Sequence, residues 1–327
     1  MATAPSAVVR VASPWTPRAL LRRLRGGDEV AHIITLIFAS SIVLITCLIV
    51  YILWIESHLA RQQFGWQFFA TRIWDPVSGD FGALPFVYGT LVTSALALLL
   101  AVPFGLGAAI FLAELAPRRV SDALAFLIDL LAAVPSVIYG LLGIFILVPI
   151  LRTTVEPALR ATFGFLPLFQ GPAYGVGFLA GGVILAIMVL PFIISVSREV
   201  LLAVPPDQRE AALSLGATRW EATAKVVIPF AKTGIMGSIF LALARALGET
   251  MAVTMVIGND PKISASLFAP GYTIAAVIAN EFTEATGDLY LHALVLLGLV
   301  LFLLTFILNG LARLLILATT QKGTAHE

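Results

Sequence analysis

The chain has 327 residues, of which 59% are hydrophobic and only 12% are charged, and its formal net charge is +1. Ordinary soluble proteins carry roughly 25% charged residues, so this chain has too few polar side chains to cover a soluble surface. The composition excludes a soluble enzyme, a disordered chain and a strongly basic nucleic-acid-binding protein, and it indicates a membrane protein that is partly covered by lipid.

Six apolar stretches are long enough to cross a bilayer as helices, which needs about 20 mostly apolar residues. They cover roughly Ile33–Ile55, Phe86–Ala113, Ala123–Leu151, Phe178–Ser197, Thr233–Ile257 and Leu291–Ala312. The sequence therefore predicts an all-α integral membrane protein with six transmembrane helices. A further apolar stretch, Ile274 to Phe282, is too short to cross and predicts a short helix at the outer surface.

The distribution of Lys and Arg predicts the direction in which the chain crosses the membrane. One side of the predicted membrane holds 14 of these residues and the other side holds five. Because cytoplasmic flanks carry the excess of positive charge, we expect both termini in the cytoplasm. The predicted organisation is a cytoplasmic N-terminal segment over 1–31, a six-span domain over 32–317 and a cytoplasmic tail over 318–327. The six-span domain includes a cytoplasmic loop at about 198–232.

Four prolines fall inside the predicted spans, and each removes a backbone hydrogen bond that must be replaced within lipid. They are Pro103, Pro135, Pro149 and Pro191. Such a proline favours either a kink that serves packing or an irregular segment that lines a cavity.

Asp129 is an ionisable residue inside the third predicted span. At 1.5 Å per residue it lies roughly 9 Å from the cytoplasmic end of that span. We therefore expect its carboxylate either to reach cytoplasmic water or to contact the 198–232 loop or the fifth span.

The cytoplasmic loop carries signals for two short helices outside the membrane. Asp207 and Glu210 have the spacing of a capping box, which predicts that a helix begins at Asp207. Gly216 suits the left-handed position just beyond a helix end. Thr218 and Glu221 repeat the capping-box spacing and predict a second helix. The small side chains of Ala211 and Ala212 give the first helix a surface with little relief. The groove of another protein can close tightly around such a helix. The alternative is an ordinary connection between spans.

Arg245 and Glu249 are two ionisable residues inside the fifth predicted span. An ionised residue at the bilayer centre costs on the order of 2.5 to 3.5 kcal/mol even on the mildest scale, so both need partners or water. Their i, i+4 spacing predicts that they share one helix face and can pair with each other. One interpretation is a purely structural pair. The other is that Arg245 lines an anion pathway, since a guanidinium binds oxyanions through two parallel N–H bonds, and that Glu249 holds it in place.

The cytoplasmic loop resembles the permease signature of ATP-binding-cassette (ABC) importers. It reads Glu-Ala-Ala at 210–212, then three residues, then Gly216, then nine residues, then an apolar stretch that ends at Pro229. In that family this helix docks in a cleft of the ATPase subunit and transmits its motion. The resemblance implies ATPase coupling by four residues, which are Glu210, Ala211, Ala212 and Gly216.

Further segments resemble the PstC-type permease subunits of high-affinity phosphate importers, from about Phe64 to Arg313. These segments include FGALPFVYGT before the second span, AVPSVIYGLLGIF in the third and RALGETMAVTMVIG in the fifth. In that family the Arg and Glu of the RALGET run are associated with phosphate passage. The resemblance implies that role for Arg245 and Glu249.

The resemblance implies a type I ABC importer (MetI-like) permease fold and a subunit of the plasma membrane that translocates inorganic phosphate into the cytoplasm. Its expected partners are a homologous second permease of the PstA type, an ATPase homodimer of the PstB type and an extracellular phosphate-binding protein of the PstS type. The chain has no G-x-x-x-x-G-K-[ST] run, so ATP and Mg are expected on the ATPase. No cofactor, metal or catalytic residue is expected in the chain itself.

Three alternatives remain at this stage. A permease for sulfate, molybdate or tungstate would share the loop and the oxyanion chemistry, but it differs in the runs of the third and fifth spans. A secondary transporter or channel needs no docking helix and would work without ATPase subunits. A membrane-embedded enzyme would need a nucleophile with a base, or a metal site, and the sequence shows neither.

Overall fold

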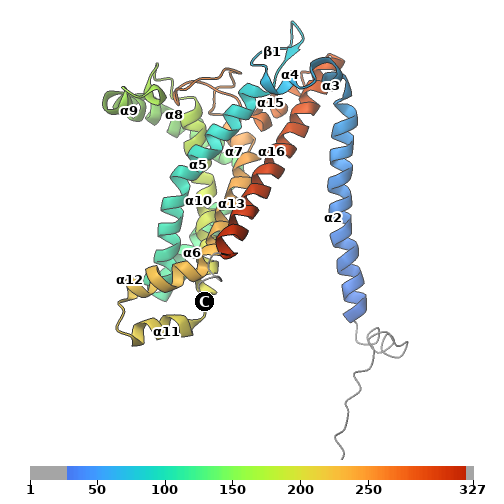
Figure 1. Ribbon diagram of the computed structural model, residues 1–327. Coiled ribbons are helices and arrows are strands. Elements are labelled where there is room, and N and C mark those ends of the chain that lie inside the picture. The colour runs from blue at the N-terminus through green and yellow to red at the C-terminus, as the bar shows by residue number, and fades with distance from the viewer. Residues whose placement is uncertain (1–27, 322–327) are drawn as a thin grey trace, which may run out of the picture. The chain divides into compact units, whose positions relative to one another are not determined.

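A computed structural model describes residues 28–321, with side chains described for residues 30–314 (Figure 1). Within these residues six helices are long and apolar enough to cross a membrane, which confirms the predicted fold class. The two strands, β1 (Trp74–Asp75) and β2 (Asp80–Phe81), form one short antiparallel hairpin. Most of the predicted terminal segments, 1–31 and 318–327, lies outside the described residues. The chain divides into two compact units, residues 1–52 and 53–327, which are described separately below.

The first unit holds most of one helix, α2 (Asp28–Glu56). Apolar side chains cover all of its sides, and none of its residues from 30 to 56 is buried. A helix that is apolar all round suits lipid or another apolar surface rather than water. α2 therefore matches the first predicted span and extends beyond it at both ends.

The short hairpin organises one end of the second unit, together with α3 (His58–Phe64) and α4 (Gln67–Ala70). Trp74 of β1 donates its indole N–H to Glu281 Oε2 at 2.8 Å, and the Tyr290 hydroxyl donates to the same oxygen at 2.6 Å. Glu281 is the last residue of α15 (Ile274–Glu281), the short surface helix that the sequence predicts. The carboxylate thus ties the hairpin to the segment between the fifth and sixth spans. We call this end, with β1, β2 and α15, the hairpin end.

The core of the second unit is the contact between α5 (Leu84–Ile110) and α10 (Phe178–Leu202), which lie side by side (Figure 1). Small residues let helix backbones approach closely in a membrane. A Cβ atom on Gly182 of α10 would collide with the side chain of Leu96, and one on Gly105 of α5 would lie 2.8 Å from Ile193 Cγ2. The two helices therefore fit only because these positions lack side chains.

The third predicted span, Ala123–Leu151, is wrong in its boundaries because the structure forms two helices there. The first, α6 (Arg118–Ala132), ends shortly before Pro135, and an unbroken helical run begins at Ser136. Pro135 stands at the N-cap of the new helix, because inside a helix its ring would clash and its missing N–H would break a bond. The run contains α7 (Ser136–Leu142), η2 (Gly143–Leu147), α8 (Val148–Ile150), η3 (Leu151–Val155) and α9 (Glu156–Phe163).

Four π-helical segments each end two residues before a proline. They are η1 (Phe111–Leu115) before Pro117, η2 before Pro149, η3 before Pro157 and η5 (Thr223–Val227) before Pro229. A proline ring inside a helix clashes with the carbonyl group four residues earlier, and at Pro149, Pro157 and Pro229 the wider π turn moves that carbonyl away. After η1 the helix instead ends at the extended residue Ala116, and Pro117 is the N-cap of the next helix. Pro103 and Pro191, by contrast, lie within α5 and α10 without a π segment.

The fifth predicted span, Thr233–Ile257, is also wrong in its boundaries, because the helix begins and ends earlier. The unbroken run starts at α12 (Arg219–Ala222), continues through η5 and ends with α13 (Ile228–Leu247). The chain then bends at Gly248, and the short helix α14 (Met251–Thr254) follows.

The remaining elements complete the second unit. The sixth span is α16 (Asp288–Gln321), which contains the predicted stretch Leu291–Ala312. A single 3-10 turn, η4 (Pro167–Phe169), precedes α10. The loop between α10 and α12 contains α11 (Pro206–Ser214) and lies at the end of the unit opposite the hairpin end (Figure 1).

A glycine pair on α5 tests the close packing of the core. A Cβ on Gly89 would collide with the backbone carbonyl of Tyr272, whereas a Cβ on Gly107 would meet nothing within 4 Å. We expect Gly89→Ala to destabilise the protein by about 1–3 kcal/mol, because a backbone atom cannot rotate away. Gly107→Ala is the matched control, and it should be neutral or stabilise by up to about 1 kcal/mol. The measurement is the thermal unfolding midpoint in detergent, and equal midpoints for the two variants would contradict the packing.

Candidate functional site

The predicted docking helix is α11, and it begins differently from the prediction. Pro205 is its N-cap residue and Pro206 its first residue, so Asp207 lies inside the first turn and makes no cap hydrogen bond. The predicted capping box of Asp207 and Glu210 is therefore wrong. The physical reason is that proline at the first helical position has a suitable φ and needs no hydrogen bond for its nitrogen. Glu210 is an exposed residue one turn into the helix.

The end of α11 agrees with the prediction for Gly216. Its φ is +87°, in the left-handed region that favours glycine. The Gly216 N–H donates to Leu213 O at 3.0 Å, and the Ala217 N–H donates to Ala212 O at 3.2 Å. These two bonds form a Schellman motif, which satisfies carbonyl groups that would otherwise lack a partner at the helix end.

The second predicted helix begins with the predicted capping box. Thr218 Oγ1 accepts from the Glu221 N–H at 3.3 Å, and Glu221 Oε2 accepts from the Thr218 N–H at 3.0 Å. Both partners are local in sequence, so the turn between α11 and α12 is fixed by residues within the loop itself.

A groove of about 500 Å³ lies between α11 and the helical run that follows it. Its walls include Ala211, Ala212 and Gly216 of the predicted docking set. Leu215, which also lines the groove, keeps 90% of its surface exposed. None of the residues of α11 is buried. The groove therefore combines the small side chains of the predicted docking set with one highly exposed leucine.

The break after α13 separates the two ionisable residues of the fifth span. Arg245 is exposed in the last turn of α13, whereas Glu249 is half-buried in the bend that follows. Among the ion pairs of the described residues, none joins Arg245 to Glu249. Glu249 Oε1 instead accepts from the Ala252 N–H at 3.2 Å, at the start of α14. The expected i, i+4 pair does not form, because the helix ends at Gly248 between the two residues.

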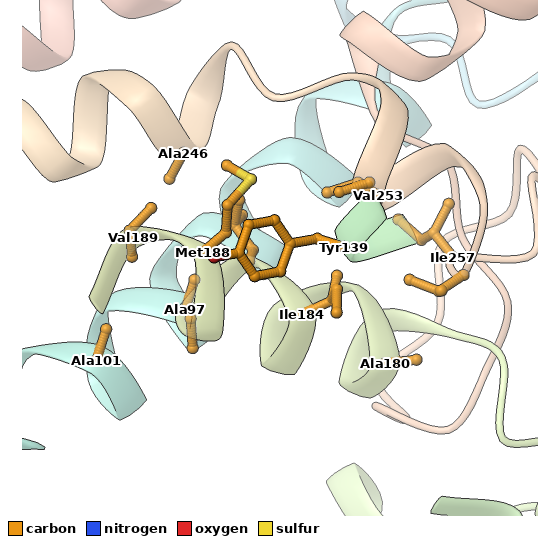
Figure 2. Close-up of a cluster of buried hydrophobic side chains, with 14 of the residues drawn as sticks. Ala97, Ala101, Tyr139, Ala180, Ile184, Met188, Val189, Ala246, Val253 and Ile257 are labelled. Carbon is orange, nitrogen blue, oxygen red and sulfur yellow. The ribbon is translucent and has the colours of Figure 1, made fainter. Parts of the chain in front are cut away.

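Arg245 is attached directly to the core of the second unit. Its neighbour Ala246 is buried in a cluster with Tyr139, Met188 and Val253 (Figure 2). These residues come from four separate elements, which fixes the end of α13 against α7, α10 and α14. The guanidinium is thus carried by a helix end that is packed into the core, and the Arg245 side chain is exposed.

The bend itself is held by close packing against α7. A Cβ on Gly140 of α7 would collide with Met255 Sδ and lie 3.3 Å from Cα of Ala252. A helix interruption within a membrane is tolerated only where it is buried in protein or lines a polar cavity. This break was not predicted from the sequence, and Gly248, in the middle of an apolar run, is the residue from which it could have been predicted.

Asp129 lies on α6 and is exposed, and its Oδ1 accepts from Ser195 Oγ of α10 at 2.9 Å. Among the described residues its hydrogen bond is thus with the fourth span rather than with the loop or the fifth span. Within residues 28–321, no group of three or more His, Cys, Asp or Glu side chains is gathered as a metal site requires.

Comparisons with known proteins place the chain in a family. Residues 101–319 match the family described as the binding-protein-dependent transport system inner membrane component. A protein of Mesorhizobium japonicum named phosphate transport system permease protein PstC is 48% identical, over 94% of this chain and 95% of that protein. A Mycobacterium tuberculosis protein named phosphate transport system permease protein PstC 2 is 38% identical, over 93% of this chain and 97% of its own length.

A solved structure agrees with the fold. A bacterial ABC transporter involved in the import of the acidic polysaccharide alginate has a TM-score of 0.51 and 16% identity. The match covers 89% of this chain and 98% of that chain, and at this identity it bears on the fold alone. Together with the identities above, the chain belongs to the binding-protein-dependent transport system inner membrane components, and among them to the PstC permeases.

Proposed function

We propose that the chain is the permease subunit through which an ATP-driven importer carries inorganic phosphate into the cytoplasm. The observation that carries this proposal is the 48% identity to a phosphate transport permease over 94% of the chain. The exposed Arg245 at the end of α13 supports it, since a guanidinium matches the oxygens of phosphate with paired N–H donors.

The exposed position of Arg245 supports a pathway that this chain lines on one side only. A lone guanidinium that faces lipid would cost on the order of 2.5 to 3.5 kcal/mol or more. A second, homologous permease of the PstA type would remove that cost by supplying the opposite wall of a water-filled path. Glu249 caps α14 and thereby holds the bend next to the guanidinium.

The groove beside α11 supports docking of an ATPase of the PstB type. Two ATPase copies would bind ATP with Mg, approach each other and move α11, so that the permease pair opens outward. An extracellular binding protein of the PstS type would then deliver phosphate at the hairpin end, and hydrolysis would return the pair to the inward-open state. In this scheme the chain itself makes and breaks no covalent bond, and it lies in the plasma membrane with α11 on the cytoplasmic side.

The proposal is tested by transport in vesicles that contain the whole complex. Labelled phosphate should accumulate when ATP is supplied on the α11 side, and a tenfold excess of sulfate should not compete. Equal uptake of sulfate would favour the alternative of a permease for another oxyanion. Phosphate uptake without the ATPase subunits would indicate a channel or secondary transporter instead.

The direction of insertion can be tested with single cysteines in a Cys47→Ala background. Val77 in the hairpin is 97% exposed, and Arg119 at the opposite end is also exposed. We expect an impermeant thiol reagent to label Val77→Cys in intact cells and Arg119→Cys only after the membrane is opened, because the basic flanks belong in the cytoplasm. Labelling of Arg119→Cys in intact cells would reverse the topology.

Gly216 offers a conformational test of the docking loop. No atom lies within 4 Å of a Cβ built there, so a substitution acts through its positive φ rather than through a clash. A left-handed conformation costs roughly 1–2 kcal/mol for most residues, and Asn adopts it most readily. We expect Gly216→Val to lower ATPase co-purification and phosphate uptake at least about fivefold, and Gly216→Asn to stay near the parent. Normal coupling in Gly216→Val would show that α11 does not need this termination.

Arg245 offers the direct test of the anion pathway. The side chain is exposed and lacks an ion pair in the described residues, so its removal should leave the assembled complex stable. We expect Arg245→Gln to lower phosphate uptake at least about tenfold, and Arg245→Lys to be impaired as well, because a point charge does not replace a bidentate donor.

The double variant Arg245→Gln, Glu249→Gln separates the pathway from a structural pair. A Gln at 249 keeps an oxygen that can accept from the Ala252 N–H, so α14 should remain in place. The double variant should therefore assemble at the parental level and still fail to import phosphate. Restored uptake at matched expression would mean that the two charges only neutralise each other.

A further inference from the structure

One guanidinium connects α11 to the ends of two membrane-crossing helices. Arg209 Nη2 donates to Glu114 Oε1 at 2.8 Å and to Leu201 O at 2.7 Å, and its Nη1 donates to Val204 O at 2.6 Å. Its Nε lies 3.2 Å from both carboxylate oxygens of Glu114. The side chains of Arg209 and Glu114 are only 23% and 9% exposed, so water competes little for these bonds.

These groups come from three helices and the connection between two of them. Arg209 is on α11, Glu114 is in η1 at the end of α5, Leu201 is in the last turn of α10, and Val204 lies just beyond that helix. Carbonyl groups at a helix C-terminus lack helical partners and carry partial negative charge, so a cation is favoured there. The planar guanidinium alone supplies enough fixed donors to bind the carboxylate and both carbonyls at once.

The other main contacts of α11 are with α12 and η5, the first turns of the fifth-span helix, and none of its residues is buried. In the part of the chain that the structure describes, Arg209 makes all the side-chain hydrogen bonds between α11 and either η1 or α10. Besides the chain connection to α10, one side chain thus joins the exposed helix by hydrogen bonds to the ends of α5 and α10.

The span ends that Arg209 joins lead to the proposed pathway. Leu112 of η1 and Leu201 and Val204 at the end of α10 share a buried cluster with Val227 and Ala231 of the fifth span. Further along the same helices, α5 and α10 contribute to the cluster that holds Ala246, the residue next to Arg245. A movement of α11 can therefore be transmitted to the bend after α13 through side chains that are packed without interruption.

We propose that Arg209 and Glu114 are positioning residues that transmit the movement of the docking helix to α5 and α10. Without this link the ATPase would still bind the exposed face of α11, but movement of α11 would no longer shift the two spans together. This inference rests on the proposed function, and it predicts uncoupling rather than loss of assembly.

The experiment compares Glu114→Gln with the parent in proteoliposomes that contain the whole complex. Glu114 lies outside α11, so its substitution leaves the docking face unchanged. We expect the ATPase to co-purify in parental amounts and ATP hydrolysis to continue. The ratio of phosphate imported to ATP hydrolysed should fall at least about fivefold, as should the stimulation of hydrolysis by the binding protein.

Two further variants sharpen the result. Arg209→Lys keeps the positive charge but loses the planar guanidinium that binds the carboxylate and the two carbonyl groups at once. Transport in this variant should therefore be uncoupled from ATP hydrolysis to a similar degree. Arg119→Gln removes an exposed cation at the same end of the molecule and should keep the parental ratio. If Arg209→Lys fails to assemble, Glu114→Gln alone decides the question.

The outcomes for this inference and for the proposed function are separate. The proposed function would be contradicted if the parental complex hydrolyses ATP in response to the binding protein but imports no phosphate. In that case the link between Arg209 and Glu114 would still be tested by comparing the stimulation of hydrolysis in Glu114→Gln with that in the parent. Parental coupling and parental stimulation in Glu114→Gln would overturn the link. Loss of ATPase co-purification in Glu114→Gln would also overturn it, because the pair would then serve assembly.

Discussion

The close contact of α5 with α10 is the constraint on which the rest of the second unit depends. In a bilayer the surrounding lipid is as apolar as the helices, so association relies on tight van der Waals packing. Gly105 and Gly182 provide that fit, and any side chain at these positions would push the helices apart. The joined pair forms the surface against which α7, α13 and α14 pack, and it thereby sets the position of Arg245.

Proline placement gives this helical frame its irregular geometry. The π segments before Pro149, Pro157 and Pro229 keep the helix continuous while they avoid the clash of the ring. Pro117 and Pro135 act differently, since each stands at the N-cap of a new helix, α6 and α7 respectively. In the loop between α10 and α12, Pro206 likewise determines where a helix begins, because it is the first residue of α11.

The parts of the fold that depend on local residues were predictable, and those that depend on distant partners were not. The termination at Gly216 and the cap of Thr218 with Glu221 use groups a few residues apart, so sequence spacing identified them. The apolar runs located six spans, but hydrophobicity alone does not reveal a break within a run, and so the breaks at Pro135 and Gly248 were missed. The pairing of Arg245 with Glu249 assumed an unbroken helix. The bond between Arg209 and Glu114 joins residues far apart in the sequence and leaves no periodic signal.

The exposed guanidinium at the end of α13 has a consequence for the supply of subunits in the cell. In the proposed complex a second permease covers this guanidinium, so a copy of this chain made without that permease would leave the exposed Arg245 uncovered in the bilayer. Such an unpartnered copy would be unstable in the bilayer and would be a substrate for membrane proteases. In the proposed complex, matched synthesis of the two permeases would therefore protect this surface, independent of any need for equal amounts in transport.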